Sequence, residues 1–191
     1  RGQHHGDAAA RVDLHDAALA GLLHPDHVPA VAAAALAYPD VERAAAQGWP
    51  ALFRLEDLAA CPPGSLARAF HSQIVDNGFD LEVLDREALG LKDLPPPLDY
   101  LNARILQVHD LWHLIGDYHT TKLHEVAISA FQLAQIGHAY SAMFLAVVGA
   151  AAAKAPPGGA TLLFDLIFTA WRHGRRTPPL IATPWEAVWD Q

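Results

Sequence analysis

The sequence predicts an all-α protein, a single mostly helical domain, from three observations. Alanine-rich runs and few β-branched stretches favour helices over strands. Proline and glycine separate the apolar runs at short intervals, which is typical of successive helices with their stop signals. A chain of 191 residues, 52% of them hydrophobic and 18% charged, is long and apolar enough to bury one core.

The first half of the chain predicts short helices and one well-delimited longer one. Residues 1–11 are expected to be a disordered leader, and residues 12–191 a single helical domain. Helical patterns cover residues 8–23, 31–36 and 41–47. Ser65 is then a candidate N-cap after a Pro-Pro-Gly sequence, and Gly78 is the matching stop. Residues 79–97 form a loop-rich connector that ends in three prolines.

The second half predicts long helices. A helix from about Leu98 to Ile115 carries one apolar stripe at helical spacing, made of Leu101, Ile105, Val108, Trp112 and Ile115. Gly116 permits a turn, and a second long helix is expected from about Leu123 into the apolar run that follows, with Gly137 and Gly149 as kinks. Residues 156–159 break it, residues 161–173 form another helix, and residues 185–189 a last short turn.

Charge and composition limit the classes of partner. The formal net charge of −8 argues against nucleic acid, because phosphate binding needs clustered Lys and Arg. The lone Cys61 excludes an internal disulfide framework and fits a reducing compartment. The longest apolar run, residues 140–153, is shorter than the roughly 20 residues that span a bilayer. It is interpreted as a core or subunit-interface helix, with contact to a membrane surface as the alternative.

The stretch HDLWHLIGDYHTTKLHE, residues 109–125, contains a candidate metal site. His109 and His113 are four residues apart and therefore share a helix face, with Asp110 on its flank. Residues 116–121 can reverse the chain, so that an antiparallel second helix brings Glu125 to the same face. Two imidazoles and two carboxylates suit Zn, Fe or Mn better than Ca or Mg. The alternative is a pair of partly buried histidines hydrogen-bonded to Asp110.

Two other motif assignments are weaker. Zinc proteases with His-x-x-x-His carry Glu in the second position, and Asp110 stands there instead. Phosphohydrolases with a His-Asp pair need a further His and a distant Asp; His71 and Asp165 could be nominated, but nothing local supports them.

The function of the cationic side chains elsewhere in the sequence can be interpreted in two ways. Arg68 is either a salt-bridging surface residue or an anion contact. The small basic patch beside Trp171, made of Arg172, Arg175 and Arg176, is either solvated charge or a contact for an anionic headgroup or carboxylate.

Several segments together resemble one family. His109-Asp110-x-x-His113 followed by Glu125 resembles the signature of the ubiquinone (coenzyme Q) biosynthesis protein 4 family. Residues 62–70, 125–135 and 174–189 are similar to further blocks of that family, so the resemblance covers roughly residues 12–189. The family usually has Gly where this chain has His124.

The resemblance implies a helical protein of the quinone pathway. The implied reaction is a metal-dependent oxidative decarboxylation, in which a polyprenylated hydroxybenzoate loses its C1 carboxylate and gains a hydroxyl there. His109, Asp110, His113 and Glu125 would act through a divalent metal: zinc is expected first, with iron, cobalt or manganese as alternatives. Candidate substrate-binding residues, chiefly for the polyprenyl tail, are Arg68, Tyr140, Phe144, Leu145 and Val148. The alternative function is a non-catalytic, lipid-binding scaffold that organises the quinone-biosynthesis enzymes around a structural metal.

The resemblance also implies partners and a location. Expected partners are the polyprenylated precursor, the membrane surface and the other quinone-biosynthesis enzymes, but no nucleic acid. A homodimer is expected. The chain would be peripheral to the membrane: at the cytoplasmic face of the inner membrane in a bacterium, or at the matrix side of the mitochondrial inner membrane in a eukaryote.

Overall fold

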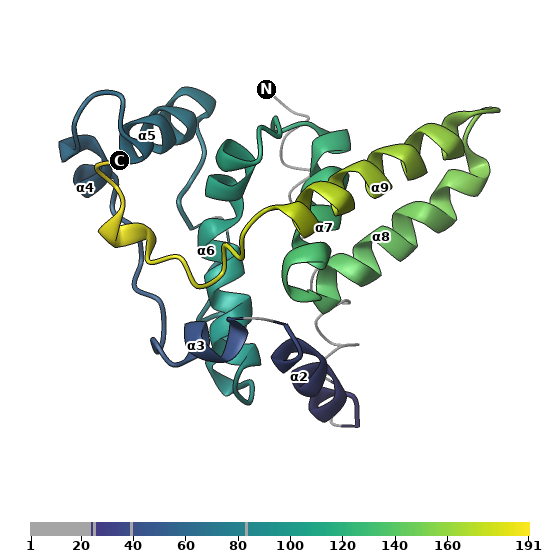
Figure 1. Cartoon of the computed structure of the whole chain (residues 1–191), viewed down its shortest axis with the longest axis horizontal. Coiled ribbons are helices and arrows are strands. Elements are labelled where there is room, and N and C mark those ends of the chain that lie inside the picture. The colour runs from purple at the N-terminus through teal and green to yellow at the C-terminus, as the bar shows by residue number, and fades with distance from the viewer. Residues whose placement is uncertain (1–23, 25, 39, 83) are drawn as a thin grey trace.

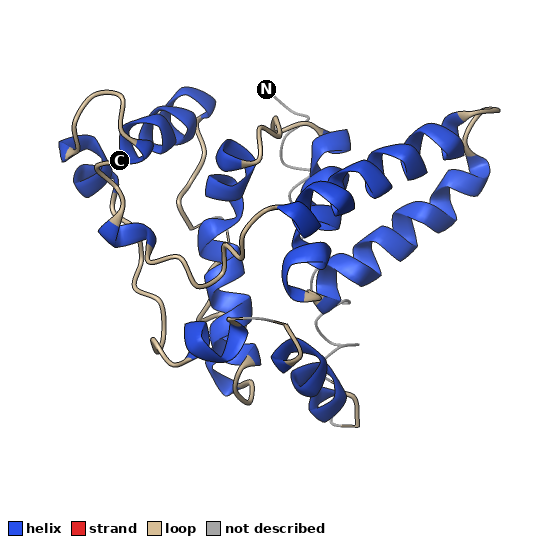
Figure 2. Ribbon diagram, in the orientation of Figure 1, coloured by secondary structure: helices blue, strands red, loops and turns tan. Residues whose placement is uncertain are grey.

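The structure, a computed structural model, describes residues 24–191 apart from 25, 39 and 83. Within these residues the regular structure is helical and contains no strand, which confirms the predicted fold class (Figure 2). None of the described helices is both long enough and apolar enough to cross a membrane. Three predictions concern residues outside this described part of the chain: the leader at residues 1–11, the domain boundary at residue 12 and the helix at residues 8–23.

The elements are α2 (Val28–Leu36), α3 (Val41–Ala45), α4 (Leu55–Ala60), α5 (Leu66–Asn77), η1 (Leu91–Asp93), α6 (Leu98–Ile115), α7 (Lys122–Ile136), α8 (Ala139–Ala151), η2 (Ala152–Lys154), α9 (Gly159–Arg176) and η3 (Trp185–Ala187). Short connections join the helices from α6 to α9, whereas a longer segment, residues 78–90, follows α5 (Figure 1). The short helix α4 has no counterpart in the sequence interpretation.

The stop signals around α5 act as predicted. The Ser65 hydroxyl accepts a hydrogen bond from the backbone N–H of Arg68, at 3.4 Å, and so caps the helix start. Gly78 ends the helix with a φ of 63°, a left-handed conformation that glycine adopts without strain. The carbonyls of Gln191 and Trp189 accept hydrogen bonds from the backbone N–H groups of Leu66 and Ala67. These bonds satisfy two donors that the first turn of helix α5 leaves without a partner inside the helix.

Helix α6 forms the centre of the core and has the predicted bounds. Leu101, Ile105, Val108 and Trp112 are buried, as their spacing predicts. Ile115, the last member of the stripe, is 36% exposed, because the helix ends there and the chain turns away at Gly116.

The second long helix predicted from about Leu123 is wrong as a single element, because the chain forms two helices there. Gly137 has a φ of 61° and ends α7, and α8 starts afresh at Ala139. A Cβ at Gly137 would lie 2.3 Å from the Tyr38 ring, so the break also makes room for close packing. Gly149 lies within α8, which continues past it to Ala151.

Helices α8 and α9 run antiparallel as an arm that extends from the rest of the molecule (Figure 1). The base of the arm is held by close packing of α9 on α7. A Cβ at Gly174 would lie 2.6 Å from the Phe131 carbonyl oxygen, so only glycine allows the two backbones to approach this closely. The Gln135 amide donates to the carbonyls of Gly174 and Thr177, at 2.6 and 2.9 Å.

The C-terminal segment is tied to α6 by a buried arginine. The Arg104 guanidinium is almost fully buried and donates to both carboxylate oxygens of Glu186, at 3.0 and 3.2 Å, and to the carbonyl of Thr183. Burial of the Glu186 carboxyl is the largest single influence and raises its pKa, but the side-chain hydrogen bond from Arg104, a backbone hydrogen bond and the positive charge of Arg104 together outweigh it and hold the pKa of Glu186 below its ordinary value.

This pair predicts acid sensitivity. A carboxyl whose folded-state pKa is depressed contributes stability above its unfolded pKa of about 4.3, and that stability is lost as the pH falls through the folded pKa. Glu186→Gln should therefore lower the free energy of unfolding by about 1–2 kcal/mol at pH 7, with the difference shrinking towards pH 3. Urea unfolding at both pH values measures it, with Glu87→Gln, which removes an exposed pair with Lys92, as the control. A deficit of equal size at both pH values would contradict the assignment.

Candidate metal centre

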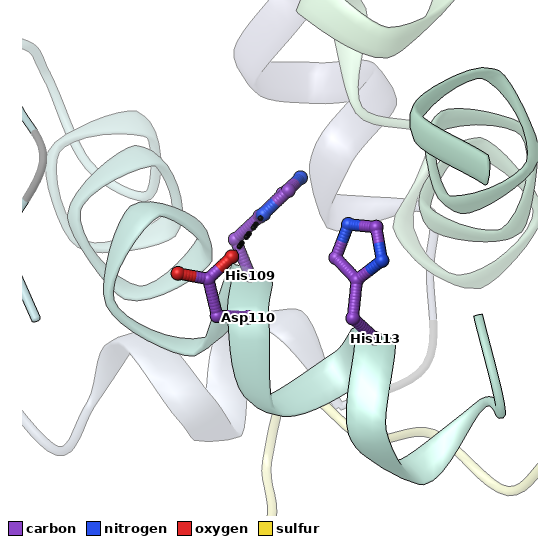
Figure 3. A group of neighbouring side chains, drawn as sticks. All are labelled: His109, Asp110 and His113. Carbon is purple, nitrogen blue, oxygen red and sulfur yellow. Dashed lines mark hydrogen bonds and ion pairs between the residues drawn. The ribbon is translucent and has the colours of Figure 1, made fainter. Parts of the chain in front are cut away.

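The predicted ligand group on α6 forms as its spacing indicates. His109 and His113 lie one helical turn apart, with ring centroids separated by 4.8 Å. One ligand atom from each of His109, Asp110 and His113 lies within 4.8 Å of the others. Figure 3 shows the two imidazoles projecting from adjoining turns, with the contact between His109 Nδ1 and Asp110 Oδ1, at 3.2 Å, drawn as a dashed line.

Glu125 joins this group from the first turn of α7. Its Oε2 lies 3.7 Å from His109 Nε2, and its Oε1 lies 3.7 Å from His113 Nε2, so one carboxylate faces both rings. Helix α7 returns in the opposite sense to α6 after the turn at residues 116–121 (Figure 1). Thr121 caps the start of α7 by accepting the N–H of His124, which fixes the start of the helix and with it the position of Glu125 in the first turn.

The protonation of His113 makes it suited to hold a cation. Its Nδ1 lies 3.1 Å from the Tyr118 carbonyl oxygen, and because a carbonyl only accepts, Nδ1 carries the proton. In the neutral imidazole the lone pair is then on Nε2, which faces Glu125 at 3.7 Å. The residue is 1% exposed, and Nε2 is buried without a hydrogen-bond partner among the described residues. A bound cation would satisfy this nitrogen, and a carbonyl behind the ring is the usual partner of a metal-ligating histidine.

The other three ligand side chains are between 25% and 31% exposed, so the group is buried on the His113 side and reaches solvent on the other. The Gln73 amide of α5 donates to the Asp110 carbonyl at 2.9 Å and holds the ligand-bearing turn against α5. Two nitrogen and two oxygen donors fit zinc, iron, cobalt or manganese. The residues present therefore fit a divalent transition metal.

The ligand group found among the described residues includes none of the remaining sequence candidates. The Arg68 guanidinium donates to the Ala59 carbonyl at 2.6 Å and so joins α4 to α5, a role that neither interpretation of Arg68 included. The ligand group found among the described residues contains neither His71 nor Asp165, the pair nominated for phosphohydrolase chemistry.

The candidate groove residues of α8 lie largely inside the molecule. Leu145 is buried in a small apolar cluster between α7, α8 and α9, and the half-buried Phe144 and Val148 pack against it. Tyr140 stacks on Phe144, with centroids 6.4 Å apart. These side chains therefore contribute to the packing of the arm, and their role in binding the substrate stays a prediction. The exposed large apolar side chains of the arm are Val147, Leu162, Phe164, Phe168 and Trp171.

The sequence interpretation missed Tyr118 and His173. The Tyr118 hydroxyl is hydrogen-bonded to His173 Nδ1 at 2.8 Å, and burial raises the pKa of Tyr118. Tyr118 contacts the ligand group through its backbone carbonyl. Every residue type has such a carbonyl, so the sequence could not indicate this contact.

Comparison with known proteins gives a consistent family. The sequence model described as "Coenzyme Q (ubiquinone) biosynthesis protein Coq4" matches residues 50–191. Two proteins named "Ubiquinone biosynthesis protein COQ4 homolog, mitochondrial", from Drosophila melanogaster and Drosophila erecta, are 31% and 30% identical over 137 residues, 70% of this chain. The matched part spans 48% of each of these relatives, so it corresponds to about half their length.

A solved structure agrees with the fold. A chain from Nostoc punctiforme PCC 73102, provisionally described as a ubiquinone biosynthesis protein, superposes with a TM-score of 0.65 at 25% identity. The superposition covers 85% of this chain and 75% of that one.

The geometry predicts one tightly bound divalent ion per chain. Elemental analysis after exhaustive dialysis should find zinc, iron, cobalt or manganese near one equivalent in the parent. His113→Gln should lower this value sharply, because it removes the buried nitrogen donor, whereas the control His71→Gln should keep it. A folded parent that takes up none of the four ions, or a His113→Gln variant that keeps a full equivalent, would show that these histidines are structural.

Proposed function

Because the chain belongs to the Coenzyme Q (ubiquinone) biosynthesis protein Coq4 family, we propose that it acts in ubiquinone biosynthesis as a metal-dependent enzyme. The proposed substrate is a polyprenylated hydroxybenzoate, which loses its C1 carboxylate and gains a hydroxyl at the same carbon. Exchange of the carboxylate for a hydroxyl is a two-electron oxidation, and we propose dioxygen as the oxidant: substrate, water and dioxygen would give the hydroxylated ring, carbon dioxide and hydrogen peroxide.

One observation carries the catalytic part of this proposal: the buried Nε2 of His113, which has no hydrogen-bond partner among the described residues and faces Glu125. His109, Asp110, His113 and Glu125 would hold the cation. A divalent cation supplies Lewis-acid stabilisation of a carboxylate or phenolate oxygen when bound in such a site. Tyr118 fixes the tautomer and the direction of the His113 ring. The exposed side of the group is where a substrate head group would enter.

A second function is favoured by the number of protein donors. Four protein ligands fill a tetrahedral zinc shell, and structural zinc sites are closed in this way, whereas catalytic ones keep a position for water or substrate. With zinc bound by all four side chains, the chain would be a lipid-binding scaffold that organises the other quinone-biosynthesis enzymes, without chemistry of its own.

The exposed face of the arm supports attachment to a membrane surface. Phe164, Phe168 and Trp171 are exposed at helical spacing on α9, and Phe164 stacks on Phe168 with centroids 6.2 Å apart. Arg175 lies over the Trp171 ring at 6.0 Å, and Arg172 and Arg176 follow on exposed positions of the same helix. Aromatic rings beside arginines suit the boundary between lipid headgroups and acyl chains. We place this surface at the cytoplasmic face of a bacterial inner membrane, or at the matrix side of the mitochondrial inner membrane if the source is eukaryotic.

The catalytic proposal predicts product formation by the purified, metal-loaded chain. Incubation with a polyprenyl hydroxybenzoate under air should give the decarboxylated, hydroxylated ring, detected by mass spectrometry. His113→Ala and Glu125→Gln should lower the rate by at least about 100-fold, because each removes a metal ligand. The control is His71→Ala at full rate. A parent that binds metal and substrate but yields no product would favour the scaffold.

The membrane proposal predicts that the parent floats with liposomes at both low and high salt. Apolar burial contributes roughly 25 cal/mol per Å² and is little affected by screening, whereas charge contacts weaken as salt rises. Phe168→Asp and Trp171→Asp should abolish flotation, and Thr169→Asp, an exposed change on the same helix, should retain it.

Other outcomes of this experiment assign the face differently. Stripping of the parent by salt alone would indicate electrostatic attachment. A parent that never floats, but is a dimer that Phe168→Asp converts to a monomer, would assign the face to contact with a second copy.

A further inference from the structure

The ligand His113 is joined to Tyr118 by two hydrogen bonds. The Tyr118 N–H donates to the His113 carbonyl at 2.9 Å, and the His113 ring donates through Nδ1 to the Tyr118 carbonyl at 3.1 Å. Residue 118 therefore holds both the backbone and the imidazole of residue 113. A shift of Tyr118 would rotate the ring and move its Nε2, the atom that faces Glu125.

Tyr118 is held in turn by its own side chain. Its ring covers Gly116 so closely that a Cβ there would lie 2.8 Å from a ring carbon. The ring meets the Phe131 ring edge-on, with centroids 6.0 Å apart. The hydroxyl is hydrogen-bonded to His173 Nδ1 at 2.8 Å and so joins the turn between α6 and α7 to α9. The position of this turn therefore depends on a residue 55 positions further along the chain.

His173 is exposed, but its backbone is held because the next residue of α9, Gly174, is buried against α7. The adjacent Gly174 lies against the Phe131 backbone, and its carbonyl accepts from the Gln135 amide at 2.6 Å. On the other side of the turn, the His119 N–H donates to His124 Nδ1 at 2.6 Å, which ties the turn to the start of α7. The turn is thus held at both ends by side chains that do not belong to the ligand group.

We propose that Tyr118 and His173 are positioning residues of the metal centre: their hydrogen bond, through the Tyr118 carbonyl, sets the direction of His113 Nε2 and so controls how firmly a divalent cation is retained. The inference rests on the metal site of the proposed function. It concerns retention of the ion and is independent of whether the ion is catalytic or structural.

The test measures Co²⁺ on the full chain, with its d–d absorption as the signature of ligand geometry and its transfer to a chelator as the release rate. Tyr118→Phe keeps the ring and removes the hydroxyl, and His173→Leu removes the acceptor. Each should speed release by roughly three- to ten-fold and shift the d–d bands, because outer partners of a ligand tune its orientation. His173→Asn, which places an oxygen near the position of Nδ1, should restore slow release.

Two controls separate positioning from a general loss of structure. Tyr38→Phe changes another half-buried tyrosine, one that packs on Gly137, and should leave release and spectrum unchanged. The metal-free variants should melt within about 4 °C of the metal-free parent, the shift expected for a weak local contact.

Each remaining outcome overturns the inference. A parent that binds Co²⁺ while Tyr118→Phe and His173→Leu release it at the parental rate overturns the inference alone. So does a His173→Asn variant as fast as His173→Leu, because the acceptor would then be irrelevant. A parent that binds no Co²⁺ overturns the inference together with the metal site of the proposed function.

Discussion

A single buried nitrogen sets the requirements for the rest of the site. His113 carries its imidazole where almost no solvent reaches, and one nitrogen is committed to the Tyr118 carbonyl. The other nitrogen faces a carboxylate at 3.7 Å, too far for a hydrogen bond but suited to a cation between them. Leaving a buried polar atom without a partner costs about 1–3 kcal/mol. The exact turn between α6 and α7, and the start of α7 at the Thr121 cap, both serve to bring Glu125 opposite this atom.

Features that depend on local chemistry could be predicted from the sequence. Helix α6 and its ligands follow from the spacing of apolar and polar residues along one helix, and α5 follows from Ser65 and Gly78 at its ends. Glu125 could be placed because a short turn between two helices leaves few ways to arrange them. In each of these features the interacting residues are close to one another in the sequence, so their spacing is enough to predict the contact.

Features that depend on distant contacts could not be predicted. Whether Gly137 kinks a helix or ends it depends on the Tyr38 ring, which lies almost a hundred positions earlier and occupies the space of a side chain. Burial on α8 could not be predicted for a related reason: that helix is apolar on nearly every face, so its pattern does not distinguish Leu145, which is inside, from Val147, which is exposed. The role of Tyr118 rests on a backbone carbonyl, which all residue types share.

Helix α9 presents two apolar surfaces, because its contact with α7 covers only part of its apolar side chains. Its core-facing side packs on α7, where Gly174 allows close approach, and so holds His173 beside the turn that carries Tyr118. Phe164, Phe168 and Trp171 lie on an adjoining flank and remain exposed. The same rigid element therefore supports the ligand group at one end and presents aromatic side chains outward along its length. If that flank lies on a membrane, the orientation of α9 fixes the orientation of the metal centre relative to the lipid surface. A substrate whose tail stays in the bilayer would then meet the site from a constant direction.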